Sequence, residues 1–72
     1  MEKVVEIIYK NYRGEVSKRK IIPEKIWYGT TKWHKKSGWL LDAFDLGKKA
    51  ERSFAIKDIQ HWKEDPDKKY IS

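Results

Sequence analysis

The sequence predicts a mainly β fold, either a small five-stranded β-barrel or a strongly curved sheet. Short segments alternate between apolar and polar residues with the period of two that is typical of strands, and none has the period of a helix. The four glycines, at positions 14, 29, 38 and 47, separate these segments as turn residues do. Closing or strongly curving the sheet would protect the edges of such short strands.

The first half of the chain contains three expected strands. Residues 4–10 alternate β-branched and aromatic residues with polar ones, and residues 11–14 then supply Asn and Gly for a turn. A second strand covers residues 15–22. Pro23 has no backbone N–H, so it should bend the strand or leave the ladder. Residues 25–30 are a further extended piece.

The second half contains the strongest expected strand. After a polar, basic loop at residues 31–38, residues 39–46 are apolar on both faces, as expected at the centre of a small barrel. We expect Trp39 to lie in the core. Residues 52–56 make the returning strand, and residues 57–62 form either a short helical turn or a last short strand.

One domain is expected, because 72 residues leave little room for a second. A chain of this size buries only about 60% of the surface that its unfolded form exposes. There is no cysteine to add disulfides, so four Trp, four Tyr and two Phe must supply much of the core. Residues 1–62 form the domain, and residues 63–72 are expected to be a polar, flexible C-terminal tail.

The charge balance indicates an anionic partner. Seventeen Lys and Arg against eleven Asp and Glu give a net charge of +6 and a pI near 9.6, and the cations are interleaved with aromatic residues. Apolar runs are far shorter than the ~18 residues that span a bilayer. The N-terminus lacks the apolar core of a signal peptide. We therefore expect a cytoplasmic protein without membrane association.

Little in the sequence could carry catalysis. There is no cysteine and no glycine-rich phosphate loop. His34 and His61 alone make a poor metal site, and Asp42 and Asp45 lie on opposite faces of one strand. We predict no enzyme activity, no metal and no cofactor.

Two arginines stand on faces where apolar residues are expected. Arg19 shares its strand face with Ser17 and Ile21, and Arg52 shares its face with Phe54. An arginine on such a face is rare unless it is paired or faces a ligand. An ion pair with an aspartate of the same fold is the structural alternative to ligand binding.

The loop after the third expected strand mixes rings with cations. Trp33 and Lys35 lie in this loop, and Trp27 and Tyr28 precede it; one of those two must face the core. A base stacked on an aromatic ring is worth roughly 1–3 kcal/mol. Trp33 is the best candidate for such stacking.

Three ordered motifs resemble the WYL domain family over about residues 4–59. Residues 9–23, YKNYRGEVSKRKIIP, are similar to the family's Tyr-x-Asn-x-x-Gly followed by Ser-x-Arg-x-Ile/Val-x-Pro. Residues 38–45, GWLLDAFD, match the Trp-Tyr-Leu that names the family, with Leu40 in place of its tyrosine. Residues 52–59, RSFAIKDI, are similar to Arg-x-Phe-x-Leu-Asp-Arg-Ile.

The resemblance implies an Sm-like, SH3-type β-barrel that binds nucleic acids or nucleotide-like anions. In the family this domain accompanies DNA-binding domains of transcription regulators or belongs to defence systems. The resemblance assigns Arg19 and Arg52 to ligand contact and places Tyr9 and Ser17 in the same region. Asp58 stands where the family has a basic residue.

We therefore expect a regulatory ligand-binding module for single-stranded DNA or RNA, or for a nucleotide-like ligand. The alternative is a protein–protein interaction or oligomerisation module, as a homodimer or in a larger regulatory or defence-related assembly. The residues expected to contact the anion are Tyr9, Ser17, Arg19, Lys20, Trp33, Lys35, Arg52 and Lys57.

Overall fold

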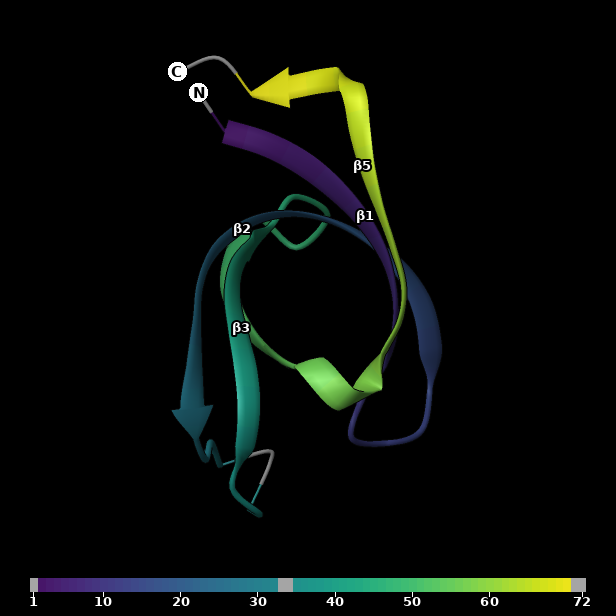
Figure 1. The fold of residues 1–72 in the computed structure, drawn as a ribbon. Coiled ribbons are helices and arrows are strands. Elements are labelled where there is room, and N and C mark those ends of the chain that lie inside the picture. Colours follow the sequence, from purple (N-terminus) through teal and green to yellow (C-terminus); the bar gives the residue numbers. More distant parts are fainter. Residues whose placement is uncertain (1, 33–34, 71–72) are drawn as a thin grey trace.

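The computed structural model describes residues 2–32 and 35–70 and is mainly β (Figure 1). Five strands follow one another along the chain, with one short 3-10 helix before the last. The elements are β1 (Glu2–Lys10), β2 (Val16–Gly29), β3 (Gly38–Asp45), β4 (Ala50–Ala55), η1 (Ile56–Asp58) and β5 (Ile59–Tyr70). The prediction of five strands is confirmed. Residues 57–62 take both expected forms, since the helical turn ends at Asp58 and the strand begins at Ile59.

The strands form a single antiparallel sheet in the order β4-β3-β2-β1-β5. The sheet curves strongly around an interior, and η1 connects its two edge strands, β4 and β5 (Figure 1). In the part of the chain that the structure describes, no ladder joins β4 to β5, so the sheet is curved but not closed by hydrogen bonds into a barrel. No helix within these residues is long and apolar enough to cross a membrane.

The second and third expected strands are one long strand, β2. Its first part pairs with β1 as far as Ile21, and from Ile21 onward it pairs with β3. Pro23 does not end the strand, because the β1 ladder has already ended at Ile21 and a missing N–H costs little there. The register to β3 shifts between Pro23 and Lys25, so the proline marks an irregularity inside β2.

The core lies on the inner face of the curved sheet. Its buried side chains come from β1, β2, β3 and β4, and two isoleucines at η1 and β5 pack against them. They are Val5, Ile7, Tyr9, Ile21, Leu41, Ala43 and Phe54, with Ile56 and Ile59 alongside. Val5, Ile7 and Tyr9 therefore share the inner face of β1, as alternation along a strand requires.

The prediction that Trp39 belongs to the core is wrong. Trp39 is 58% exposed and packs edge-to-face on Tyr28, with ring centroids 5.3 Å apart. The two residues face each other near the end of the β2–β3 ladder, outside the cluster of buried side chains. Trp27 is the half-buried member of the pair Trp27–Tyr28, and its indole N–H donates to Asp42 Oδ1 at 2.8 Å.

The polar segment predicted to be a tail from residue 63 is part of β5 as far as Tyr70. Its backbone pairs with β1 at Glu6–Lys63 and, after a register shift, at Glu2–Tyr70. The composition of the segment has little to bury, but a ladder is made by backbone groups and does not require apolar side chains.

Candidate anion-binding site

Arg19 forms a structural ion pair with Asp45. Arg19 lies on β2 opposite Ile7, which places it on the inner face, and its Nη1 donates to Asp45 Oδ2 at 2.9 Å. The Asp45 side chain is 1% exposed and that of Arg19 16%. The other oxygen of Asp45 accepts the backbone N–H groups of Gly47 and Lys48, at 3.0 and 3.1 Å. One buried carboxylate therefore fixes both Arg19 and the β3–β4 turn.

Further contacts hold the Arg19 guanidinium in place. Its Nε donates to Ser17 Oγ at 3.1 Å, and its central carbon lies 5.9 Å from the centroid of the Phe54 ring. Ser17, predicted to line the site, is therefore a partner of Arg19. A guanidinium held by an anion, a hydroxyl and an aromatic face has little freedom left to reorganise when a ligand arrives.

Arg19 lines a cavity of 260 Å³ that we call the arginine pocket. Four cations from four segments line it: one from the β1–β2 turn, one from β2, one from the β3–β4 turn and one from β4. They are Arg13, Arg19, Lys48 and Arg52. Glu15 is the carboxylate among the residues of the wall, and it accepts a hydrogen bond from Asn11 Nδ2 at 3.1 Å. The pocket therefore carries a clear excess of positive charge.

Arg52 has surroundings unlike those of Arg19. It lies on the edge strand β4 opposite Ala43 and is exposed. Among the side chains that the structure describes, those of residues 3–32 and 35–64, neither Arg52 nor Lys48 makes an ion pair. Arg19 therefore forms the ion pair with an aspartate that was the alternative to ligand binding. Arg52 lines the pocket, and none of the described side chains pairs with its charge.

Tyr9 and Phe54 form the apolar part of the pocket wall. Their rings meet edge-to-face, with centroids 4.8 Å apart, and both side chains are buried. The Tyr9 hydroxyl accepts the N–H of Ala55 at 3.0 Å. Burial raises the pKa of Tyr9 above its ordinary value of 10.0, although the Ala55 N–H opposes this shift. Tyr9 is therefore a neutral phenol that fixes β4 against β1.

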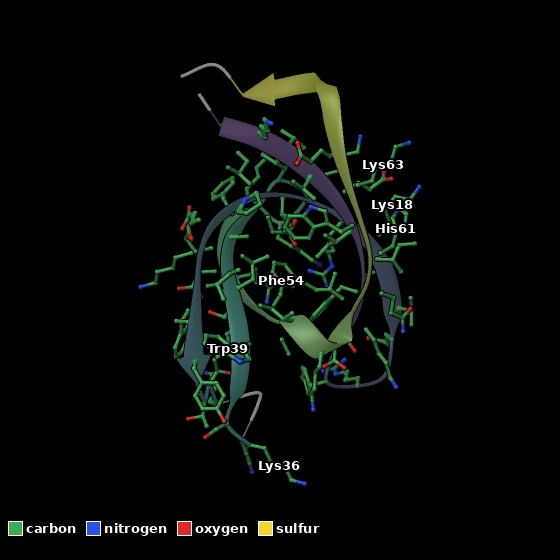
Figure 2. The ribbon with its side chains drawn as sticks, viewed as in Figure 1. Lys18, Lys36, Trp39, Phe54, His61 and Lys63 are labelled. Atoms are coloured by element: carbon green, nitrogen blue, oxygen red, sulfur yellow. The ribbon has the colours of Figure 1, made fainter. Side chains whose placement is uncertain are left out.

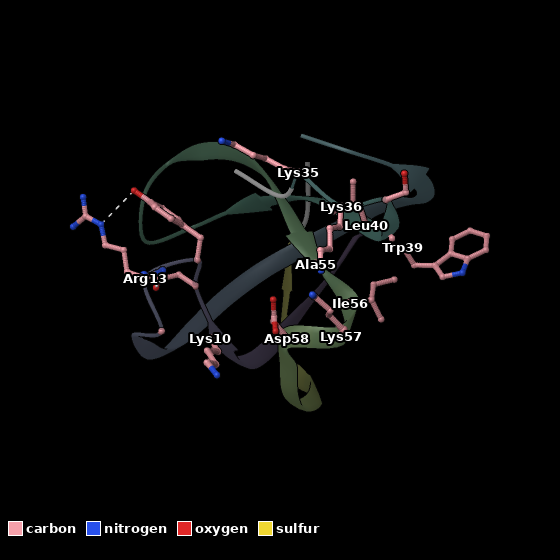
Figure 3. Close-up of a pocket in the computed structure, with 15 residues that line it drawn as sticks. Lys10, Arg13, Lys35, Lys36, Trp39, Leu40, Ala55, Ile56, Lys57 and Asp58 are labelled. Atoms are coloured by element: carbon pink, nitrogen blue, oxygen red, sulfur yellow. Dashed lines mark hydrogen bonds between the residues drawn. The ribbon is translucent and has the colours of Figure 1, made fainter. Parts of the chain in front are cut away.

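A larger cavity of 1010 Å³ opens beside the arginine pocket, and we call it the aromatic groove (Figure 3). It is formed by the β1–β2 turn, the end of the β2–β3 loop with the start of β3, and the residues of η1. Its five cations are Lys10, Arg13, Lys35, Lys36 and Lys57, and Asp58 is its carboxylate. Tyr12 and Trp39 contribute exposed rings, and Leu40 and Ala55 contribute buried apolar groups.

The β1–β2 turn belongs to both cavities, since Asn11, Tyr12 and Arg13 line each of them. Asn11 organises this turn: its Oδ1 accepts the N–H groups of Arg13 and Glu15 at 2.9 and 3.0 Å. Gly14 takes a φ of +82°, which favours glycine. The Asn-x-x-Gly spacing is thus the local reason why Tyr12 and Arg13 project at the junction of the two cavities.

Tyr12 and Arg13 also contact each other. Arg13 Nε donates to the Tyr12 hydroxyl at 3.2 Å, and the guanidinium carbon lies 5.6 Å from the ring centroid. This hydrogen bond raises the pKa of Arg13 further, so the guanidinium keeps its charge throughout the physiological pH range.

The predicted binding residues fall into separate places. Tyr9, Arg19 and Arg52 meet in the arginine pocket, and Lys35 and Lys57 line the aromatic groove. A third cavity, of 660 Å³, holds the remaining two, Ser17 and Lys20. The prediction for Trp33 lies outside the described residues.

The predicted set did not include Tyr12, Arg13, Trp39 and Lys48, which are among the residues that line the two cavities. Two of them carried a signal in the sequence. Arg13 lies inside the Asn-x-x-Gly turn, and Lys48 follows an Asp-x-Gly sequence in which the Asp45 carboxylate caps the turn. Basic residues in such turns project at the end of a sheet, where loops carry binding sites.

No three His, Cys, Asp or Glu side chains lie close enough together to hold a metal ion within the described residues. No protein-family model matches the chain, and no curated protein or solved structure has significant similarity to it.

Proposed function

We propose that this chain is a binding module for single-stranded nucleic acid or a nucleotide-like anion, with a phosphate seated in the arginine pocket. The observation that carries the proposal is the convergence of Arg13, Arg19, Lys48 and Arg52, from four separate segments, on one cavity of 260 Å³. Guanidinium groups match phosphate oxygens with pairs of donors, and lysine adds a point charge. The net charge of +6 would also draw an anionic chain to the surface.

The cations of the pocket differ in mobility, and this difference supports the proposal. Arg19 is held by Asp45 and Ser17, so it gives the pocket a fixed donor group. Arg52 and Lys48 are exposed and can move onto the phosphate. Because Arg19 is already fixed, less side-chain entropy is lost when a phosphate binds. The mobile side chains of Arg52 and Lys48 can adjust to phosphates that differ in position.

We infer from the order of the strands that the sheet has the arrangement of a small barrel. The strand order β4-β3-β2-β1-β5, with a 3-10 turn between the two edge strands, supports the Sm-like, SH3-type arrangement that the WYL resemblance implies. We infer that the chain is a WYL-like module whose edges approach each other through η1. Its role would be to bind an anionic ligand, because four of the residues that line the pocket are cations and Glu15 is the carboxylate among them.

A short single-stranded deoxythymidine oligonucleotide tests the proposal. If about four phosphates are contacted, the logarithm of the binding constant falls with the logarithm of salt concentration at a slope near −3. Arg52→Ala should weaken binding about tenfold and make the slope less steep by about 0.7, with the thermal midpoint kept. Lys63→Ala removes an equal charge from β5, outside the pocket, and serves as the matched control.

Two results would count against this function. The first is absence of oligonucleotide binding even at low salt. The second is an equal loss for Lys63→Ala and Arg52→Ala, which would mean that net charge alone attracts the strand. Figure 2 shows Lys63 on β5 well away from Phe54 in the interior, which makes the control a fair one.

A second candidate function is protein–protein interaction or oligomerisation within a regulatory or defence-related assembly. Three large apolar side chains favour it: Ile26, Tyr28 and Trp39 are 61%, 59% and 58% exposed and lie together on the β2–β3 ladder. Exposed apolar clusters of this kind often mark interaction surfaces. Light scattering over a range of concentrations would reveal a homodimer, and a strict monomer would argue against self-association.

A further inference from the structure

The aromatic groove is adjacent to the arginine pocket and suits a different part of the same ligand. Asn11, Tyr12 and Arg13 line both cavities, so a chain that leaves the pocket past this turn enters the groove. We propose that the groove holds the nucleotides adjoining the phosphate in the pocket, by stacking bases on Trp39 and Tyr12, so that the ligand is a single strand of several nucleotides and not a free mononucleotide. This inference rests on the function proposed above.

The arginine pocket is small and the aromatic groove is large, as expected if one holds a single phosphate and the other holds the adjoining nucleotides. The arginine pocket, at 260 Å³, lies just below the range of about 300–1,000 Å³ that is common for small-molecule sites. It is large enough for a phosphate with its sugar. The groove, at 1010 Å³, lies at the upper end of that range, which suits a segment of chain.

The charges along the groove favour a backbone of phosphates. Lys10, Lys35, Lys36 and Lys57 line it together with Arg13, against the single carboxylate of Asp58 in its wall. Figure 3 shows Lys35 on one side of the groove and Lys10 and Lys57 on the other. A track of cations with rings beside it is how proteins hold single strands without reading their sequence.

The two rings are positioned in advance of binding. Trp39 is 58% exposed, and its edge-to-face contact with Tyr28 limits how its indole can turn. Tyr12 is 54% exposed and is tied to the Arg13 guanidinium. Figure 3 places Arg13 and Trp39 at opposite ends of the groove. One ring would therefore stack near the junction with the pocket and the other at the far end.

The floor between the rings is apolar and buried. Leu40 is 1% exposed and Ala55 4%, and both line the groove. An acidic peptide would meet the same cations and the same floor. Rings at both ends of a line of cations favour bases, because every base presents a flat face to an aromatic side chain whatever its sequence.

Three ligands and five proteins separate these possibilities. The ligands are thymidine 5′-monophosphate, a deoxythymidine tetranucleotide and a hexaglutamate peptide, measured at one salt concentration. The proteins are the wild type, Trp39→Ala, Trp39→Phe, Trp62→Ala and Arg52→Ala. Trp62 is a matched control, because it is 46% exposed on β5 and lines none of the three cavities described above.

The wild type should bind the tetranucleotide at least about tenfold more tightly than the mononucleotide, since each stacked base contributes roughly that factor. Trp39→Ala should weaken the tetranucleotide about tenfold and leave the mononucleotide unchanged. Trp39→Phe should retain most of the affinity, and Trp62→Ala should alter neither ligand. Arg52→Ala should weaken both ligands. A thermal melt of each variant verifies that the fold is intact.

The possible failures are distinguishable. If the mononucleotide binds as tightly as the tetranucleotide, or if Trp39→Ala behaves like Trp62→Ala, the groove proposal is overturned while the pocket proposal stands. If hexaglutamate matches the tetranucleotide and loses its affinity in Trp39→Ala, the groove is a peptide site. If the wild type binds neither nucleotide ligand, both proposals fail.

Discussion

The inner face of the sheet carries two arginines in contrasting regions. Arg19 lies on β2 opposite Ile7 of β1, is mostly buried and is tied to Asp45 and Ser17. Arg52 lies on the edge strand β4 and is exposed. Both line the arginine pocket, but Arg19 stabilises the fold through its ion pair and Arg52 lies at the surface. A strand arginine can therefore stabilise the fold and also line a binding site.

The position in the sheet accounts for this contrast. Arg19 lies on β2 two residues before the β2–β3 ladder begins, beside the buried carboxylate at the end of β3. Its charge is largely cut off from water there and requires a buried partner. The β2–β3 register supplies that partner, because Asp45 pairs with Ile21, two residues from Arg19. β4 has a neighbour on one side only, so Arg52 reaches water past the open edge.

The largest effect should come from breaking the buried pair. Asp45→Ala leaves the Arg19 charge without its partner and the N–H groups of Gly47 and Lys48 without an acceptor. We expect a loss of about 3 kcal/mol in the free energy of unfolding, measured by urea denaturation. Arg52→Ala should cost less than about 0.5 kcal/mol in the same assay. Equal losses of unfolding free energy in Asp45→Ala and Arg52→Ala would show that the ion pair of Arg19 contributes no more to stability than the exposed Arg52.

A much smaller effect is expected on the other face of β4. Glu51 neighbours Arg52 in sequence, and a hydrogen bond with Glu24, together with slight desolvation and the charges of Glu24 and Asp42, raises the pKa of Glu51. A raised pKa in the folded state means that ionised Glu51 is disfavoured there. Its unfavourable contribution therefore appears as the pH rises through the folded pKa and is absent well below 4.5, the ordinary value.

Glu51→Gln should therefore raise the thermal midpoint slightly at neutral pH and leave it unchanged in acid below that range. Glu24→Gln should produce a similar gain, because it removes the other member of the same repulsion. Thermal melts at the two pH values provide the measurement. A fall in the midpoint at neutral pH would show that Glu51 and Glu24 do not repel each other.

Much of the fold could be predicted from the alternation of side chains. It accounts for Val5, Ile7 and Tyr9 sharing one face of β1 and for Arg19 sharing the face of Ile21 on β2. It could not predict that β2 continues past Pro23, because that depends on where the β1 ladder ends. Nor could it predict that β5 reaches Tyr70, since backbone pairing with β1 extends the strand where the side chains carry no pattern.

The site was only partly predictable for a related reason. Tyr9, Arg19 and Arg52 meet as the motifs suggested, because strand faces are a local property. The pairing of Arg19 with Asp45, 26 residues apart, depends on the register of two strands. The same holds for Arg13 and Lys48, which reach the pocket from turns whose positions relative to each other only the folded sheet determines.

The central claim is that an anion occupies the arginine pocket next to a fixed Arg19. A proton–nitrogen correlation spectrum of the arginine Nε–Hε groups, recorded while the deoxythymidine oligonucleotide is added, tests it most directly. We predict a large shift for the exposed Arg52, and smaller shifts for Arg19 and Arg13, whose Nε groups already donate to Ser17 and Tyr12. An unchanged signal from Arg52, with the perturbed amides gathered around Lys63 on β5, would contradict the claim.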